Sequence, residues 1–337
     1  MFNRLVVFAV LALALSAGAP ATAGAAGPVE LKIATLAPRN SAWAKAMDQG
    51  ARESDSKTSG RVKLRYYYGG QQGDERDMVR KMAAGQLDGA VLTAVGLGII
   101  VPEVRILELP TMFANVTELD FVRDAMTSVF EKLFDAKGYV LVSWGDVGWI
   151  HTFSTQKYDT LDKMKQAKAW VWTDDPLTRA MQQRLGINGI PMSLPQVLSG
   201  LQTGAIDTCY ASPLAAIALQ WYTKIKFAAD KPLSYAVGGF IIRKDVFAML
   251  SAEDQKAFLD GAHANAKVII AGIRKDNDRA KAAMIKAGVQ FVPVPDDVQK
   301  VFVAAAEGVW KDLTGKLYDQ ALLDQVLAQR KKARAAK

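Results

Sequence analysis

A strand and helix rhythm that occurs twice constrains this chain more than any other feature. The first series predicts strands at 31–35, 62–68 and 87–92, with helices at 42–59 and 75–84. The second series predicts strands at 139–144, 167–172, 190–192 and 206–210, with helices at 176–185 and 195–203. Such alternation is typical of mostly parallel sheets flanked by helices and joined by right-handed crossovers. Two similar α/β units predict a pair of hinged lobes.

Local signals place several of these boundaries. Ser41 is a predicted N-cap, and Gly85 and Gly204 each end a helix before an apolar residue and an aspartate. Further along, Ser251 opens a capping-box-like quartet that starts a long helix. The remaining elements are a long helix over 214–226, a strand over 237–242, a long helical region over 251–287 and an amphipathic helical region over 296–329.

The first 26 residues have the pattern of a secretory signal. Arg4 precedes an apolar run from Leu5 to Leu15, and small residues follow, so cleavage is predicted near Ala23 to Ala26. The run is shorter than a membrane-spanning helix, and no later segment has about twenty uncharged apolar residues. We therefore expect a free periplasmic protein.

Composition narrows the function further. The formal charge is +8, but lysines and arginines alternate with acids, which favours a solvated basic surface over a nucleic-acid partner. The dense cluster at 330–334 is predicted to be a frayed end within a basic tail over 330–337. The single cysteine, Cys209, excludes an intramolecular disulfide and a multi-cysteine metal site.

The parts of a catalytic site are missing. Only His151 and His263 are available, and nucleophile-elbow, phosphate-loop and His-Glu-x-x-His motifs do not occur. The adjacent carboxylates Asp174 and Asp175 precede Pro176, where helix capping explains them more simply than acid-base chemistry or a cation site. We predict no enzyme, no cofactor and no metal site.

Two tryptophans alternate across Val171 at the end of a predicted strand. Trp170 and Trp172 therefore share one face of that strand, just before the chain turns into a helix. Open α/β sheets bind ligands at such ends. The alternative is that both indoles fill a core, which is the commoner fate of a tryptophan.

The exported start, Leu-Pro-Thr-Met-Phe at 109–113, Leu-Gln-Thr-Gly-Ala-Ile-Asp at 201–207 and the following Pro213 resemble the DctP-type solute-binding proteins of TRAP transporters. The resemblance covers about residues 31–329. It implies two α/β lobes around a ligand cleft and a very long helix that spans both. The expected division is 27–147 with about 232–265 in lobe I, and 148–231 with about 266–329 in lobe II and the spanning helices.

The resemblance also implies an arginine that holds the ligand carboxylate, within a Lys-x-Arg-x-Pro segment. Aligned on Lys168, that position is Trp170 here, and Trp172 replaces the proline. A second basic position aligns with Gly148-Trp149-Ile150, again without arginine. These departures predict a hydrophobic or aromatic ligand, a class that includes lipid-like molecules. They also predict that Trp170→Arg would turn the preference toward carboxylates. The predicted ligand-binding residues are Trp170, Trp172, Trp149, Trp43, Asn40, Thr93, Tyr210, Ser212 and Tyr235.

Two rival ligand classes stay open from the sequence. An organic-acid binder would rebuild its anion site from Arg39, His151 or Arg179, and a carbohydrate or polyol binder would use Asn40, Gln72 and Asp174. The implied partner is a TRAP-type membrane permease or a periplasmic helical-repeat protein.

Overall fold

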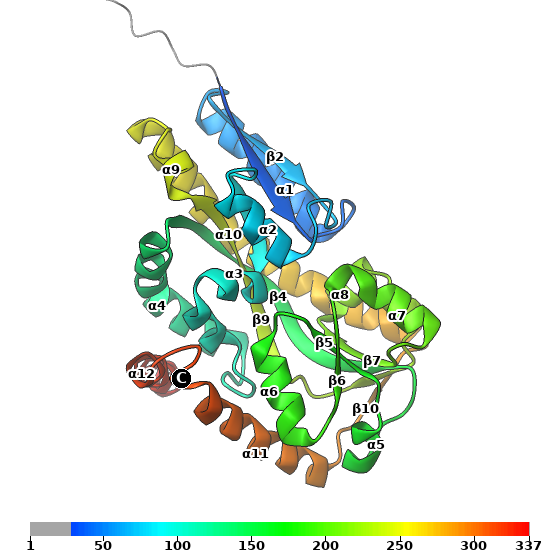
Figure 1. The fold of residues 1–337 in the computed structure, drawn as a ribbon. Coiled ribbons are helices and arrows are strands. Elements are labelled where there is room, and N and C mark those ends of the chain that lie inside the picture. Colours follow the sequence, from blue (N-terminus) through cyan, green and yellow to red (C-terminus); the bar gives the residue numbers. More distant parts are fainter. Residues whose placement is uncertain (1–27, 337) are drawn as a thin grey trace, which may run out of the picture.

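The computed structural model describes residues 28–336. It has two lobes (Figure 1). Lobe I contains a sheet in the order β2-β1-β3-β9-β4. Its strands are β1 (Val29–Thr35), β2 (Val62–Tyr67), β3 (Gly89–Thr93), β9 (Ser234–Arg243) and the first part of β4 (Tyr139–Ser154). β1 is parallel to β2 and β3, whereas β9 is antiparallel to β3 and β4. The sheet is thus mixed, where a mostly parallel one was predicted, because β9 re-enters it from lobe II.

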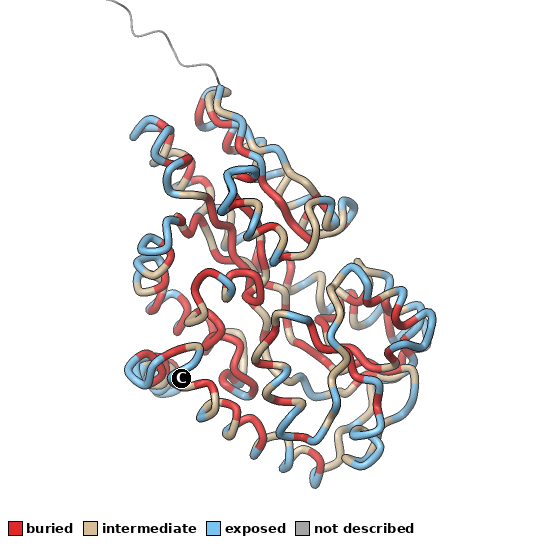
Figure 2. Tube along the Cα trace, in the orientation of Figure 1, coloured by how far each residue is buried: buried red, intermediate tan, exposed pale blue. Residues whose placement is uncertain are grey.

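Helices cover both faces of the lobe I sheet. One face is covered by α1 (Ala42–Lys57) and α10 (Ala252–Lys286), and the other by α2 (Glu75–Ala83), α3 (Ala94–Ile100), the 3₁₀ helix η1 (Pro102–Glu108) and α4 (Val116–Ala136). The short helix α9 (Lys244–Phe247) follows β9. Buried residues run along the strands and the inner sides of these helices (Figure 2). Each face therefore has its own hydrophobic core.

Lobe II contains the smaller sheet. Its strands are the end of β4, β5 (Ala169–Trp172), β6 (Gly189–Met192), β7 (Thr208–Ala211), β8 (Phe227–Ala229) and β10 (Gln290–Val292). Its helices are α5 (Leu161–Lys165), α6 (Pro176–Leu185), η2 (Leu194–Gln196), α7 (Val197–Thr203), α8 (Pro213–Ala218) and η3 (Trp221–Thr223). β5 is parallel to β6 and β7, as the second strand and helix series predicted.

The long strand β4 connects the two lobes. It pairs with β9 as far as Ile150 and then with β7 and β8 from His151 onward. The sequence predicted this strand only as far as Trp144, because Gly145 and Gly148 follow. Gly148 adopts a φ of +124° and lies against Asn277 of α10, where a Cβ would come within 2.7 Å of Nδ2. Glycine therefore lets the strand pass close to α10 rather than ending it.

Three C-terminal helices link the lobes a second time. α10 contacts α1 in lobe I and α8 in lobe II, α11 (Asp296–Leu313) packs on α6, and α12 (Gln320–Ala335) returns to α4 (Figure 1). The predicted long helix over 251–287, with Ser251 as its N-cap, is confirmed. The predicted fraying of the cluster at 330–334 is wrong, because α12 continues to Ala335 and Arg334 pairs with Glu118.

Two other predicted helices are interrupted. The helix expected over 214–226 ends at Ala218, because Gln220 takes a left-handed φ of 61° that brings Trp221 into the core. The region over 296–329 is broken between α11 and α12, where Gly315 has a φ of +78° and Asp319 caps the next helix.

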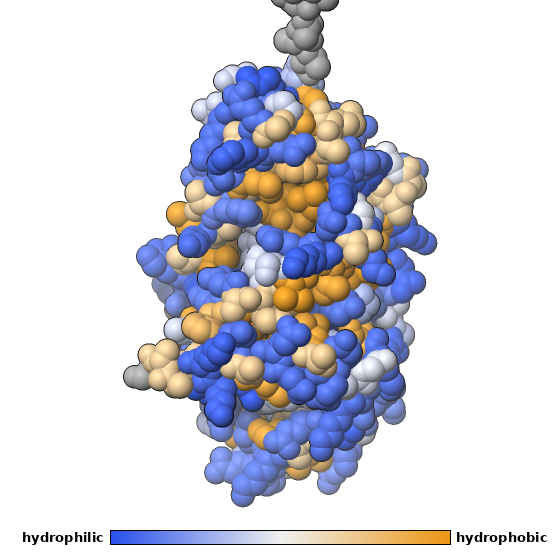
Figure 3. All heavy atoms as spheres, turned by 90° about the vertical axis from the view of Figure 1, so that its left-hand side faces the viewer, coloured by the Kyte–Doolittle hydropathy of each residue, from blue (hydrophilic) through white to orange (hydrophobic). Residues whose placement is uncertain are grey.

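The face shown in Figure 3 is mostly hydrophilic, with apolar side chains gathered near its middle. Within residues 28–336, no helix has the length and apolar character needed to cross a membrane.

Candidate ligand site between the lobes

A cavity of about 430 Å³ lies between the lobes and is lined by both. Four strands reach it with their C-terminal residues: Thr35 of β1 and Thr93 of β3 in lobe I, and Trp172 of β5 and Ala211 of β7 in lobe II. The carboxyl ends of parallel strands are where open α/β folds bind ligands. The cavity is therefore the candidate site.

The structure brings six of the nine predicted residues to this cavity. They are Trp43, Thr93, Trp170, Trp172, Tyr210 and Ser212. Asn40 is exposed and lies off the cavity wall. Trp149 and Tyr235 pack edge to face, with ring centroids 5.0 Å apart, and line a separate hollow.

Trp170 borders the cavity but belongs mainly to the core of lobe II. Its side chain stacks on Tyr210, with 4.5 Å between ring centroids, and meets Trp221 edge-on at 5.5 Å. The indole Nε1 donates to the backbone oxygen of Met192 over 2.9 Å. Since Trp170 is only 1% exposed, most of its surface is already in contact with protein.

Trp172 makes a contact across the cleft. Its Nε1 donates to Oδ2 of Asp74 over 2.9 Å, and the backbone N–H of Leu194 donates to the same oxygen over 3.2 Å. Asp74 belongs to lobe I, where it caps α2. A second contact between the lobes joins Arg76 to Asp174. These bonds define a closed arrangement of the two lobes.

Asp175 confirms the predicted capping role. It is the N-cap of α6, and its carboxylate accepts from the backbone N–H groups of Leu177 and Thr178 and from the hydroxyl of Tyr210. It also accepts from Nη2 of Arg105 over 2.8 Å. Tyr210 thus contributes to the cavity wall and holds a carboxylate in place.

Arg105 is a candidate site residue that the sequence analysis missed. It lies on η1 at the cavity wall, and its side chain is 4% exposed. Nη2 lies 2.8 Å from Asp175 Oδ1 and 3.2 Å from Glu108 Oε2, whereas Nε and Nη1 have no hydrogen-bond partner. Elsewhere in residues 28–336, the buried side-chain nitrogens and oxygens all have partners. The sequence did carry one signal for this site: Arg105 and Glu108 are charged residues inside the otherwise apolar run at 104–109.

Besides Asp175, the carboxylates of Glu75 and Glu108 act on this arginine. Glu75 accepts from the backbone N–H of Thr93 and Gly96 and from the Thr93 hydroxyl, and burial raises its pKa to about 8. Glu108 accepts from the backbone N–H of Val237, and burial raises its pKa to about 7 although Arg105 acts in the opposite direction. The cluster is therefore rich in acids relative to its single cation.

The residues proposed for the rival anion site do not meet at the cavity. Arg39 is exposed and pairs with Asp48, and Arg179 is bonded to the backbone oxygen of Thr173. His151 contacts the backbone oxygen of Ala229 at 2.8 Å, and burial lowers its pKa. The polyol candidates Asn40, Gln72 and Asp174 are likewise absent from the cavity wall.

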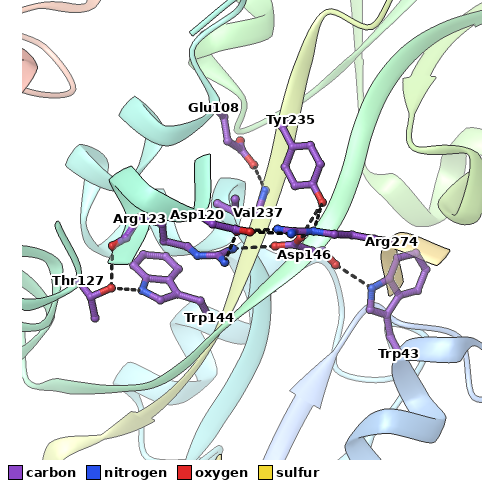
Figure 4. A network of polar contacts seen from close by, with 10 residues as sticks. All are labelled: Trp43, Glu108, Asp120, Arg123, Thr127, Trp144, Asp146, Tyr235, Val237 and Arg274. Atoms are coloured by element: carbon purple, nitrogen blue, oxygen red, sulfur yellow. Dashed lines mark hydrogen bonds and ion pairs between the residues drawn. The ribbon is translucent and has the colours of Figure 1, made fainter. Parts of the chain in front are cut away.

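A second polar network supports the site where β4 passes α10 (Figure 4). The buried carboxylate of Asp146 accepts from Arg123 and Arg274 over 2.7 Å each, and from the Tyr235 hydroxyl over 2.6 Å. Its backbone oxygen accepts from Nε1 of Trp43, 3.0 Å away on α1. The network joins α1, α4, β4, β9 and α10 and gives Tyr235 a structural contact.

Cys209 is buried, and burial raises the pKa of its thiol. Among residues 28–336, no group of three or more His, Cys, Asp or Glu side chains is arranged to hold a metal ion. What the geometry does support is enclosure of a small molecule between two lobes. The fold and the site together define a two-lobed solute-binding protein.

Comparison with known proteins specifies the family. Residues 33–316 match the DctP family model, "Bacterial extracellular solute-binding protein, family 7", so the chain belongs to that family. A solute-binding protein from Verminephrobacter eiseniae is 27% identical over 311 residues, covering 91% of this chain and 90% of its own.

Solved structures have the same fold. The sugar acid binding protein DctPAm from Advenella mimigardefordensis, solved with galactonate, superposes with a TM-score of 0.85 at 18% identity, covering 91% of this chain and 99% of its own. A TRAP periplasmic solute-binding protein from Chromohalobacter salexigens, solved with D-glucuronate, gives 0.81 at 23% identity, with 90% and 99% covered. The two-lobed fold and the resemblance to TRAP receptors are thereby confirmed.

Proposed function

We propose that this protein is a TRAP-type receptor that captures a small organic acid between its lobes. The observation that carries the proposal is the guanidinium of Arg105, which lies at the cavity wall and has two buried nitrogens without a hydrogen-bond partner. Buried donors without acceptors are costly, so a ligand oxygen is the natural partner, and a carboxylate is the strongest one. The galactonate and glucuronate bound by the two similar receptors are both carboxylates.

The ligand class predicted from the sequence is revised by this proposal. A hydrophobic or lipid-like ligand has no support among these receptors, and a purely apolar molecule would leave the Arg105 nitrogens unpaired. The apolar walls, which include Trp144, Ile150 and Leu177, suit the carbon skeleton of the acid. A neutral polyol lacks the polar partners that were predicted for it, since these lie off the cavity.

Export and partner follow from the same family. The predicted signal at 1–26 lies outside the described residues, and the similar receptor from Chromohalobacter salexigens is a periplasmic protein. Delivery to a TRAP-type membrane permease accords with that receptor. The helical-repeat partner stays a prediction without support here.

A matched ligand panel tests the proposal. Heat-unfolding of the exported protein would be followed with sugar acids, 2-hydroxy acids and 2-keto acids, each beside its neutral amide or parent sugar, and with apolar aromatics. Binding to the folded state raises the unfolding temperature. We expect at least one acid to do so while its neutral counterpart does not. Stabilisation by apolar molecules or free sugars alone would overturn the proposal.

A further inference from the structure

We infer that Arg105 of lobe I binds the carboxylate of the ligand, at a place different from the β5 position where the family resemblance puts an arginine. This inference rests on the proposed function, since it names the residue that would hold the acid. It assigns the anion site to η1, a segment before the Leu-Pro-Thr-Met-Phe motif.

The hydrogen bonds of Arg105 leave donors for a ligand. A guanidinium carries five N–H groups. The two on Nη2 face Asp175 and Glu108, while the three on Nε and Nη1 have no partner in the structure. The side chain borders the inter-lobe cavity while Nε and Nη1 are themselves buried, so we infer that a small movement of the guanidinium toward the cavity brings these nitrogens to a bound acceptor.

The Arg105 side chain packs directly against Gly98. A Cβ at Gly98 of α3 would lie 2.9 Å from Cγ and 3.0 Å from Cδ of Arg105. Glycine at this position therefore leaves the room that the arginine side chain occupies. A side chain that is already held loses little conformational freedom when it binds a ligand.

Lobe II completes the site from the opposite side. Asp175 is held by two backbone N–H groups of α6 and by Tyr210, so its carboxylate has one fixed place. It meets Arg105 only when the lobes are together. The position that the resemblance reserves for an arginine, Trp170, is instead packed into lobe II with its Nε1 bonded to Met192. Recognition of the acid and closure of the lobes thus share one guanidinium.

The test uses D-glucuronate and D-glucuronamide as a matched probe pair, titrated against the exported protein by intrinsic tryptophan fluorescence. Arg105→Gln should weaken glucuronate binding at least about 30-fold, and should remove most of the preference for the acid over the amide. A residue that only supported the fold would weaken both probes equally, so the ratio of the two affinities is the decisive measurement.

Companion variants keep the test interpretable. Arg105→Gln/Glu108→Gln removes the arginine with one of its carboxylates, in case the single variant does not fold. Gly98→Ala displaces Arg105 without changing any charge and should weaken glucuronate about tenfold. Arg39→Ala, Arg179→Ala and Gly272→Ala are the controls, because both arginines lie off the cavity and nothing lies within 4 Å of a Cβ at Gly272.

The outcomes separate the two proposals. If wild type prefers glucuronate to the amide, and folded Arg105 variants keep that preference, then the assignment to Arg105 is wrong and the organic-acid function stands. If wild type binds no acid of the panel, then the proposed function itself fails. Loss of the preference in Arg39→Ala or Arg179→Ala, with Arg105→Gln unaffected, would move the anion site to that residue.

Discussion

Arg105 in lobe I and Asp175 in lobe II form a buried ion pair across the cleft, with 2.8 Å between Nη2 and Oδ1. Each side chain is less than 5% exposed. The bond from Trp172 to Asp74 crosses the same cleft, and so does the pair of Arg76 and Asp174. The lobes are therefore held together by polar contacts that segment 172–175 of lobe II makes with α2 and η1 of lobe I.

Trp172→Phe should weaken the closed arrangement of the lobes while keeping an aromatic ring in the cavity wall. The substitution removes the donor to Asp74, and a hydrogen bond to a charged group contributes about 1.5–3 kcal/mol. We expect roughly tenfold weaker binding of D-glucuronate by calorimetry and a larger radius of gyration in solution scattering. Trp144→Phe is the control for the scattering measurement, because its indole bonds to Thr127 within lobe I. Equal compactness of both variants would contradict the role of Trp172 in closure.

The stability of the protein should depend on pH through Glu75 and Glu108. Burial raises their pKa values to about 8 and about 7, from 4.5 in an unfolded chain. The folded state then holds more protons than the unfolded state between about pH 4.5 and 8, so these groups make the free energy of unfolding fall as pH rises through that range.

Urea unfolding at pH 5, 6, 7 and 8 measures this effect. Glu108→Gln, which does not titrate, is the comparison. The stability of wild type relative to that variant should decrease from pH 5 to pH 8, by on the order of a few kcal/mol. A relative stability that stays constant from pH 5 to pH 8 would show that Glu108 is already ionised in the folded protein over this range.

Binding of an acid should take up a proton. A ligand carboxylate beside Arg105 adds a third negative group to a guanidinium already shared by Asp175 and Glu108, which favours the protonated form of Glu108. Calorimetric titration with D-glucuronate at pH 7.5, in two buffers of different ionisation enthalpy, should therefore give different apparent enthalpies. Glu108→Gln should remove most of the difference. Identical enthalpies for wild type in both buffers would contradict this linkage.

The sequence alone predicted that Trp170→Arg would turn the ligand preference toward carboxylates. The structure instead predicts that this substitution destabilises the folded protein. The indole is packed between Tyr210 and Trp221, so an arginine there loses those contacts and buries a charge without a partner. We expect a loss of more than about 3 kcal/mol in urea unfolding. Trp170→Phe, which keeps an aromatic ring, should cost less. A Trp170→Arg variant as stable as wild type would mean that this side chain reaches the open cavity.

Asp146→Asn, which replaces one carboxylate oxygen by an amide nitrogen, should strongly destabilise the folded protein. Arg123 and Arg274 both depend on this buried carboxylate, and breaking a buried ion pair costs about 3–5 kcal/mol. Asp312→Asn is the matched control, because its partner Arg184 is exposed and such pairs contribute about 0–1 kcal/mol. Comparable losses for the two variants, measured by urea unfolding, would contradict the structural weight given to Asp146.

Local sequence signals were sufficient for much of the fold. The N-cap at Ser41, the helix stops at Gly85 and Gly204 and the long helix after Ser251 depend on neighbours a few residues apart. The extension of β4 through Gly148 and the break at Gln220 were missed, because both are decided by distant contacts: Asn277 against the first, and burial of Trp221 beyond the second.

The sequence by itself determined the two α/β lobes, the strand ends that form the cleft and the loss of arginine from the expected position in β5. Only the tertiary structure decided where the charge needed for an acid lies. Arg105 and Asp175 are 70 residues apart, and their pairing depends on the lobes meeting rather than on any local pattern. Desolvation is the physical reason: an arginine in an apolar run is unremarkable until the fold buries it with donors left unpaired.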